Sequence, residues 1–191
     1  IHASLGAKIV EFGGFEMPVQ YSGIIDEHLA VRNKVGVFDV SHMGEFEVRG
    51  KEALAFLQKA TINDISKLTE GRAQYSAMCY EDGGIVDDLL VYHCGDHYML
   101  VVNASNTAKD FEWLRSQAAS GVELSDVSDS FSLLAVQGPK SQATLQKLTK
   151  IDLSKMEYYH FTRGNLAGEK MIISRTGYTG EPGFELYFSS N

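Results

Sequence analysis

Very short glycine-containing turns join several strand-like segments of this sequence, and they restrict the fold more than any other feature. The turn Glu81-Asp82-Gly83-Gly84 separates the strand-like segment 74–80 from the segment 85–92. A connection this short links antiparallel neighbours, because parallel strands need a crossover of about a dozen residues or more. We therefore predict an α+β fold with mainly antiparallel sheets. Further strand-like segments are Glu45–Arg49, Tyr98–Asn103, Phe131–Val136, Lys170–Ser174 and Phe184–Phe188.

Helical spacing of apolar residues predicts four helices between these strands. They are expected over 24–35, over 53–60, over 108–118 and from Gly138-Pro139 onward, because proline fits the first turn of a helix. The span 44–127 reads as strand, helix, three strands, helix and strand, so we predict one compact α/β insertion there. The segments 1–43 and 128–191 are then expected to pack together as a second, discontinuous domain.

The composition argues against two classes of function. The 191 residues include 17 Lys and Arg against 25 Asp and Glu, a formal net charge of −8 at pH 7. Nucleic-acid binding needs a basic stripe that neutralises phosphates, and the sequence has none. No apolar run approaches the ~20 residues of a membrane-spanning helix. We therefore expect a soluble protein that binds neither nucleic acid nor a membrane.

An aspartate pair, Asp87 and Asp88, lies inside an apolar strand-like run. Side chains alternate along a strand, so each face of this one should carry one carboxylate among apolar residues. Burying a charge there is costly unless a partner compensates it, which favours at least one Asp facing a cleft or a partner. The alternative is that both residues sit at a strand end, solvated or capping a turn.

The segment from Ser174 to Glu185 has a glycine at every third position from 177 to 183. This spacing matches neither the dinucleotide fingerprint nor the phosphate loop, so the pattern alone favours a long glycine-rich hairpin. A functional alternative starts from Glu185. A carboxylate can accept two parallel hydrogen bonds from an amino group and a neighbouring ring N–H, and a pterin presents that edge.

Histidines and tyrosines give weaker signals. A structural role in a turn is the simpler interpretation of His42. No histidine or cysteine spacing matches a metal site, so no metal is expected, although the acidic residues named above could in principle ligate one. Aromatic residues beside the motifs fit either the walls of a site for a flat heterocycle or ordinary core. These residues are Tyr75, Tyr92, Tyr158, Tyr159 and Tyr178.

Six motifs follow one another along the chain in a characteristic order: Leu5-Gly6-Ala7-Lys8 through Phe15-Glu16-Met17-Pro18, Glu27-His28-Leu29-Ala30-Val31-Arg32, Phe38-Asp39-Val40-Ser41-His42-Met43-Gly44, Gly83-Gly84-Ile85-Val86-Asp87-Asp88, Val136-Gln137-Gly138-Pro139 and Ser174-Arg175-Thr176-Gly177-Tyr178-Thr179-Gly180-Glu181. Together they resemble the aminomethyltransferase family, the T-proteins of the glycine cleavage system. The resemblance runs from end to end but covers about the first half of the family's usual length. We therefore expect the chain to be truncated, with the C-terminal domain absent.

The resemblance implies a one-carbon transferase. Such an enzyme receives an aminomethyl-lipoyl arm from the lipoyl carrier protein (H-protein) of the glycine cleavage system. It releases ammonia and passes the one-carbon unit to tetrahydrofolate, giving 5,10-methylenetetrahydrofolate. Tetrahydrofolate is thus the acceptor substrate, and no metal is required. The implied location is the bacterial cytoplasm, which is favoured, or the mitochondrial matrix of a eukaryote.

The resemblance also implies roles for individual residues. The discontinuous domain 1–43 and 128–191 corresponds to the folate-binding domain. The family's essential aspartate corresponds to Asp88, where a fixed carboxylate can orient the attacking folate nitrogen, help move its proton and stabilise positive charge. The carboxylate that grips the pterin corresponds to Glu185. Other folate-pocket positions correspond to Met43, Tyr75, Tyr92, Asn103, Tyr158, Tyr159, Arg163 and Tyr178.

Two alternative functions share this resemblance. The first is the folate domain of a dimethylglycine or sarcosine dehydrogenase, but the flavin-binding G-x-G-x-x-G pattern of those enzymes is absent here. The second is a non-catalytic folate-binding accessory protein of iron–sulfur maintenance, whose diagnostic cysteine motif would lie beyond residue 191. The sequence that follows in the full-length protein would separate these alternatives.

Overall fold

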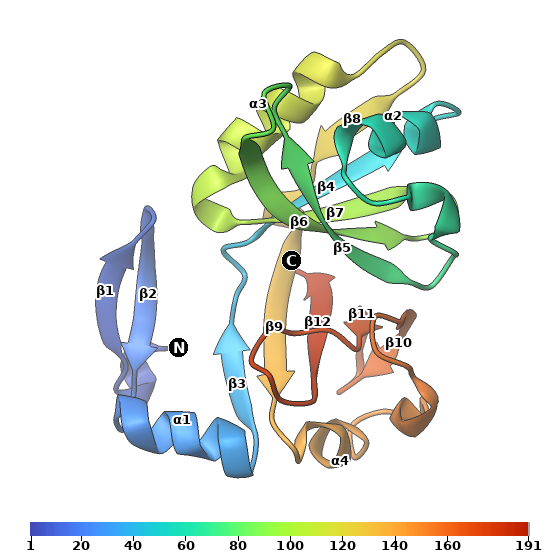
Figure 1. The fold of residues 1–191 in the computed structure, drawn as a ribbon. Helices are drawn as coiled ribbons and strands as arrows, with labels where there is room; N and C mark the ends of the chain where they lie inside the picture. Colours follow the sequence, from blue (N-terminus) through green and yellow to red (C-terminus); the bar gives the residue numbers. More distant parts are fainter. Residues whose placement is uncertain (191) are drawn as a thin grey trace. The chain divides into compact units, whose positions relative to one another are not determined.

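The computed structural model describes residues 1–190, which form two compact units (Figure 1). Unit 1 comprises Ile1–His42, Ser132–Tyr158 and Thr162–Ser189, and unit 2 comprises Met43–Phe131, Tyr159–Phe161 and Ser190. The sheets pair antiparallel neighbours such as β5 with β6 and β11 with β12, which confirms the α+β class. In this part of the chain no helix is long and apolar enough to cross a membrane.

Unit 2 is a five-stranded sheet in the order β5-β6-β7-β4-β8, with α2 and α3 against one face (Figure 1). The tight turn 81–84 joins β5 to β6 as a hairpin, as its length predicted. The bounds of the elements are β4 Gly44–Arg49, α2 Ala53–Ala60, β5 Ala73–Cys79, β6 Ile85–His93, β7 Tyr98–Val102, α3 Thr107–Gln117 and β8 Glu123–Asp126, with 3-10 turns at Ile65–Lys67, Ala104–Asn106 and Ser128–Ser130.

The core of unit 2 lies between the sheet and its two helices. The alternating residues Phe46 and Val48 of β4 point into it and are fully buried, as is Leu57 of α2. Burying a large apolar side chain contributes about 1.5–3 kcal/mol, so this cluster is the main source of the unit's stability. Because Phe46 and Val48 face the helices, the intervening Glu45 and Glu47 lie on the opposite face of the sheet.

A β-bulge interrupts the regular alternation at the start of β6. The β5–β6 register shifts between Met78 and Cys79, which leaves Val86 as an extra residue on β6. Regular alternation would place Ile85 on the same face as Asp87 and Val86 on the face of Asp88, and the structure differs from this. Val86 is buried in the core cluster and Ile85 is 70% exposed. A bulge moves the residues before it by one position relative to the sheet, and hence to the other face.

Unit 1 combines a five-stranded sheet, in the order β10-β11-β12-β9-β3, with the separate hairpin of β1 and β2. Its core includes Val136, Leu153 and Phe184, which come from segments far apart in sequence. The bounds are β1 Lys8–Phe12, β2 Phe15–Gln20, α1 Ile24–Asn33, β3 Gly36–Asp39, β9 Phe131–Gln137, α4 Ser141–Leu145, β10 Phe161–Leu166, β11 Glu169–Ser174 and β12 Gly183–Ser189, with 3-10 turns at Ala3–Leu5 and Leu153–Lys155.

Two helices of unit 1 differ from the sequence prediction. The first, α1, ends at Asn33 and not at residue 35, and Gly36 begins strand β3. The last, α4, begins at Ser141 and not at the Gly138-Pro139 pair. Gly138 has a φ of +130°, and a Cβ there would lie 2.6 Å from the carbonyl oxygen of Lys34. This glycine therefore serves a close approach of two chain segments.

The glycine-rich segment between β11 and β12 surrounds the buried side chain of Gln137. The Gln137 amide nitrogen donates to the carbonyl oxygens of Thr176 (3.2 Å) and Phe184 (3.3 Å), and its oxygen accepts from the Thr179 hydroxyl (3.0 Å). A Cβ at Gly183 would lie 2.2 Å from Gln137. Two of the three glycines, Gly177 and Gly183, are thus explained by the packing of one buried amide, as expected for a structural hairpin.

Gly183→Ala should lower the free energy of unfolding by about 1–3 kcal/mol, because its new methyl group would overlap the Gln137 side chain. Urea denaturation of the full-length protein measures this effect. The matched control repeats the substitution in a Gln137→Ala background, where the overlap no longer exists and the added cost should largely disappear. Equal costs in the two backgrounds would show that the packing of Gln137 does not require this glycine.

Candidate functional site

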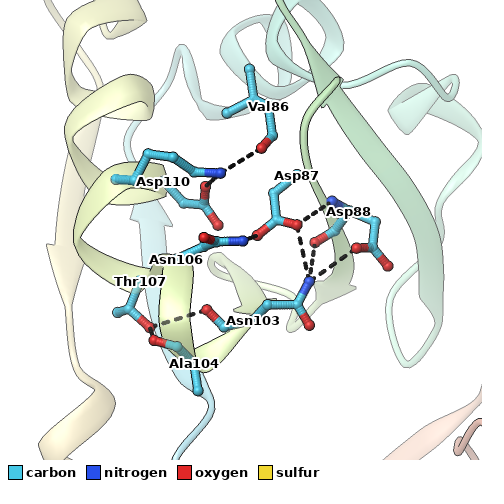
Figure 2. A network of polar contacts seen from close by, with 9 residues as sticks. Val86, Asp87, Asp88, Asn103, Ala104, Asn106, Thr107 and Asp110 are labelled. Carbon is cyan, nitrogen blue, oxygen red and sulfur yellow. Dashed lines mark hydrogen bonds and ion pairs between the residues drawn. The ribbon is translucent and has the colours of Figure 1, made fainter. Parts of the chain in front are cut away.

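Asp88 is held by two side chains from neighbouring strands of unit 2. The Tyr75 hydroxyl on β5 donates to its Oδ2 at 2.8 Å. The Asn103 amide just after β7 donates to its Oδ1 at 2.9 Å (Figure 2). The hydrogen bond to Asp88 and the charge of that carboxylate raise the pKa of Tyr75, so this phenol remains a donor. Two fixed donors therefore orient a half-buried carboxylate.

Asp87 points to the helix side of the sheet and is buried. It accepts from the Asn103 amide (3.1 Å) and from the backbone N–H of Asp88 (3.0 Å) on Oδ1, and from the Asn106 amide (2.8 Å) on Oδ2 (Figure 2). Burial acts to raise its pKa, but its polar neighbours, among them the Asn106 and Asn103 donors, outweigh it and lower the pKa. The two aspartates thus lie on opposite faces of β6, and Asn103 bridges them.

The first turns of α3 supply the remaining groups on the helix side. Lys109 donates from Nζ to the backbone carbonyl oxygen of Val86 at 2.6 Å, at the bulge of β6. Asp110 has a fully buried side chain and lies 3.6 Å from Lys109 Nζ. Residues 106, 109 and 110 share one side of the helix because positions three and four apart are neighbours. This side of α3 therefore binds the bulge that precedes Asp88.

The other predicted site residues of unit 2 vary in exposure. Tyr75 is 55% exposed, whereas Tyr92 is fully buried and packs on Phe161 with 5.2 Å between the ring centroids. Met43 is half-buried. Tyr159, also half-buried, has a φ of +60°, and its carbonyl oxygen accepts from the N–H of Ala73 at 2.8 Å. In unit 2, Tyr75 and Asn103 contact Asp88 directly.

Glu185 is the central acidic group of unit 1. It lies at the start of β12, pairs with Ser174 of β11, and is only 6% exposed. Its Oε2 accepts from the Thr176 hydroxyl. Burial raises its pKa, an effect that this hydrogen bond opposes. Within residues 1–190 the structure shows no donor to the other oxygen, so the carboxylate retains capacity for a ligand.

The remaining predicted residues of unit 1 fall in two places. Tyr178 is 85% exposed in the β11–β12 connection, and the Tyr158 hydroxyl donates to the carbonyl oxygen of Gly177 in the same connection at 3.1 Å. Arg163 instead lines a hollow of about 580 Å³ with Lys147 and Lys150. None of the other predicted site residues lines this hollow.

Sequence reasoning missed several groups near Asp88. Asn106, Lys109 and Asp110 lie on a predicted helix but have no motif of their own. An acidic residue at a buried position of an amphipathic helix was the available signal for Asp110. Glu45 was also missed: it is 2% exposed, and burial, with the nearby Asp126 carboxylate, raises its pKa to about 8. In the described part of the chain no cluster of His, Cys, Asp or Glu has a metal-binding arrangement.

The chain is similar to bacterial proteins named aminomethyltransferase. It is 61% identical over 188 residues to that of Chloroherpeton thalassium, covering 97% of this chain and 52% of that protein. It is 57% identical over 192 residues to that of Flavobacterium psychrophilum, covering 100% of this chain and 53% of that protein. The chain thus spans about half the length of the curated relatives it matches.

Solved structures show the same relationship. The crystal structure of glycine cleavage system aminomethyltransferase T from Bartonella henselae matches with a TM-score of 0.88 at 34% identity, covering 98% of this chain and 51% of that chain. Heterotetrameric sarcosine oxidase from Corynebacterium sp. U-96 matches with a TM-score of 0.62 at 19% identity, covering 86% and 82%, which shows a shared fold alone. The family model described as the GCVT N-terminal domain matches residues 1–191, and the chain therefore belongs to this family.

Proposed function

We propose that the full-length protein containing this chain is the aminomethyltransferase of a glycine cleavage system. It transfers the one-carbon unit of an aminomethyl-lipoyl group to tetrahydrofolate, releases ammonia and forms 5,10-methylenetetrahydrofolate. The observation that carries this proposal is the 57–61% identity to named aminomethyltransferases along 97–100% of the chain. The geometry supports it, because Asp88 is oriented by Tyr75 and Asn103.

We assign Asp88 as the catalytic residue. The carbon–sulfur bond breaks, its electron pair goes to the lipoyl sulfur, and the carbon becomes iminium-like on its own amino nitrogen. One folate nitrogen attacks this carbon, and the amino group then leaves as ammonia when the second folate nitrogen closes the methylene bridge. A carboxylate whose two oxygens are already oriented can accept or guide the proton of the attacking nitrogen and stabilise the developing positive charge without reorganising. Tyr75 and Asn103 leave the carboxylate half-buried, so it keeps its orientation and remains accessible.

We propose that Glu185 recognises the pterin. The Thr176 hydroxyl occupies Oε2, and the low exposure of the carboxylate strengthens any hydrogen bond that it makes to a ligand. The domain of 1–43 and 128–191 is then the folate-binding domain, and 44–127 is the inserted domain. The other residues proposed to bind tetrahydrofolate are Met43, Tyr75, Tyr92, Asn103, Tyr158, Tyr159, Arg163 and Tyr178.

The proposed partner is the lipoyl-bearing H-protein, because the donor substrate is carried on its lipoyl arm. The named relatives come from bacteria, which supports a cytoplasmic location. The alternative of a folate domain of a dimethylglycine or sarcosine dehydrogenase is not favoured. The likeness to a sarcosine oxidase at 19% identity shows a shared fold alone, whereas the relatives at 57–61% identity bear the name aminomethyltransferase. A non-catalytic accessory protein would bind tetrahydrofolate without turnover.

Asp88→Asn should reduce turnover by about 10²-fold or more in the full-length protein, because the charge is removed while shape and hydrogen-bonding partners are nearly kept. The measurement is methylenetetrahydrofolate formation from aminomethyl-loaded H-protein, with circular dichroism as a folding check. Asp129→Asn, an exposed aspartate of unit 2, is the matched control and should have normal turnover. Near-normal turnover of a folded Asp88→Asn variant would reject this carboxylate as the catalytic group.

Glu185→Gln should weaken tetrahydrofolate binding about tenfold or more, because a hydrogen bond to a charged group contributes about 1.5–3 kcal/mol. Binding to the wild type should also weaken as the pH falls, and at a higher pH than for an ordinary glutamate, since burial raises the pKa of Glu185 and protonation removes the acceptor. Calorimetry measures both effects. Glu169→Gln, an exposed glutamate on β11, should bind normally, and unchanged affinity in Glu185→Gln would remove the pterin assignment.

A further inference from the structure

Asp110 is a fully buried acid whose carboxyl oxygens have no ordinary hydrogen-bond donor. Its side chain is 0% exposed, and neither Oδ1 nor Oδ2 has a hydrogen-bond partner among the described residues. Lys109 Nζ lies 3.6 Å from Oδ1, but it is directed to the Val86 carbonyl oxygen at 2.6 Å. A buried carboxylate without donors is costly, so this group requires a physical explanation.

Protonation resolves the problem, because a neutral carboxyl group has a proton to donate and carries no charge to desolvate. The acceptor lies across the helix–sheet interface. Asn106 donates to Asp87 Oδ2 at 2.8 Å, and Asp110 lies four residues later on the same side of α3, so this side of the helix places Asp110 next to Asp87. Figure 2 shows the Asp110 carboxyl group beside Asn106 and toward Asp87. Asp87 already accepts from Asn103, Asn106 and the N–H of Asp88, which favour its ionised form. One proton on Asp110 therefore removes the buried charge and gives Asp87 a further donor.

We propose that Asp110 is protonated and donates a hydrogen bond to Asp87, and that this bond makes Asp110 a positioning residue for Asp88. The second half of the proposal rests on the proposed function of Asp88. Asp110 itself touches no substrate, and it acts through Asp87 and the Asn103 bridge.

The electrostatics agree with this geometry. Burial, and then the adjacent Asp87 carboxylate, raise the pKa of Asp110 to about 7, which Lys109 partly opposes. The pKa of Asp87 is lowered. Two neighbouring acids with oppositely shifted pKa values are typical of a pair that shares one proton. Asp87 on β6 and Lys109 on α3 are the charged groups that act on Asp110 in the described residues.

The hydrogen bond from Asp110 to Asp87 can influence Asp88 because it holds the bulged start of β6 against α3. Val86 is the extra residue of the bulge, and its carbonyl oxygen binds Lys109. Asp87 follows at once and is held by Asn106 and Asp110, and the N–H of Asp88 binds back to Asp87 Oδ1. Bulges re-aim the side chains that follow them. Anchoring this one to α3 therefore sets the direction of Asp88.

Stability gives a first test with a defined sign. Asp110 has a folded pKa near 7 against an ordinary value of 3.8, so the folded state binds a proton that the unfolded state has lost between about pH 4 and 7. Stability from this group is therefore complete at the acid end and falls as the pH rises through 7. Urea denaturation from pH 5 to 8 should show a larger loss for the full-length wild type than for Asp110→Asn. Parallel pH profiles would overturn the protonated state.

Infrared spectroscopy can detect the proton on Asp110 directly. Infrared difference spectra between wild type and Asp110→Asn at pH 5.5 should contain the carbonyl stretch of a protonated carboxyl group, which disappears as the pH rises through 7. Glu112→Gln on the exposed side of α3 is the matched control and should not remove this band. The contribution of Glu45, whose pKa is about 8, is the same in both proteins and cancels in the difference. A difference spectrum without this band would overturn the proposal whatever the activity.

The positioning role is tested by two substitutions of similar size. Asp110→Leu removes the donor and should lower kcat about tenfold, with the KM for tetrahydrofolate within about twofold, because binding groups are untouched. Asp110→Asn keeps an N–H donor toward Asp87 and should recover most of the lost kcat. Unchanged kcat in a folded Asp110→Leu variant, or no recovery in Asp110→Asn, would overturn the positioning role.

The outcome for Asp110 can be separated from that for the proposed function. If the wild type forms no methylenetetrahydrofolate, the proposed function fails, but the infrared band still decides the protonation of Asp110. The side-chain amide signal of Asn103 in an NMR spectrum then reports the coupling to Asp88. It should shift in Asp110→Leu and return in Asp110→Asn, and an unshifted signal in Asp110→Leu would reject the coupling.

Discussion

The candidate site of unit 2 depends on the hydrogen bonds that the buried Asp87 carboxylate accepts. This carboxylate lies on the helix side of β6 and gathers donors from Asn103, Asn106 and the backbone N–H of Asp88. A buried carboxylate is tolerated only when such donors replace its lost water. Once they are in place, the strand, the segment after β7 and the start of α3 are bound to one group. Asp88 receives its orientation from this arrangement.

This arrangement explains why two adjacent aspartates can have different roles. Asp87 is buried and accepts several hydrogen bonds, so its role is structural. Asp88 lies on the other face, half-buried, with one donor on each oxygen. The proposed chemistry needs a carboxylate that is oriented but still accessible, and only Asp88 combines these properties. The buried Asp110 fits the same scheme as a proton donor to Asp87.

The glycine-rich connection of unit 1 shows how a suggestive pattern can have a structural origin. Its glycines allow Gln137 to be enclosed, and the buried amide bonds to both sides of the connection. Glu185 lies directly after this enclosed segment and is buried with it. The segment that encloses Gln137 therefore leads directly into β12 and places the Glu185 carboxylate, the proposed pterin contact, at the start of that strand.

The sequence by itself determined the α+β class, since a four-residue turn between strand-like segments allows only antiparallel pairing. It also located α2 and α3 to within a few residues, and family resemblance singled out Asp88 and Glu185. The tertiary structure alone decided the bulge at Val86, the enclosure of Gln137 and the burial of Asp110 on the side of α3 that binds Asp87. The reason is that local patterns report periodicity and turn length, whereas burial and hydrogen bonding depend on which distant segments meet. Asp110 is an ordinary helical aspartate until folding removes its water and places it beside Asp87, 23 residues earlier in the chain.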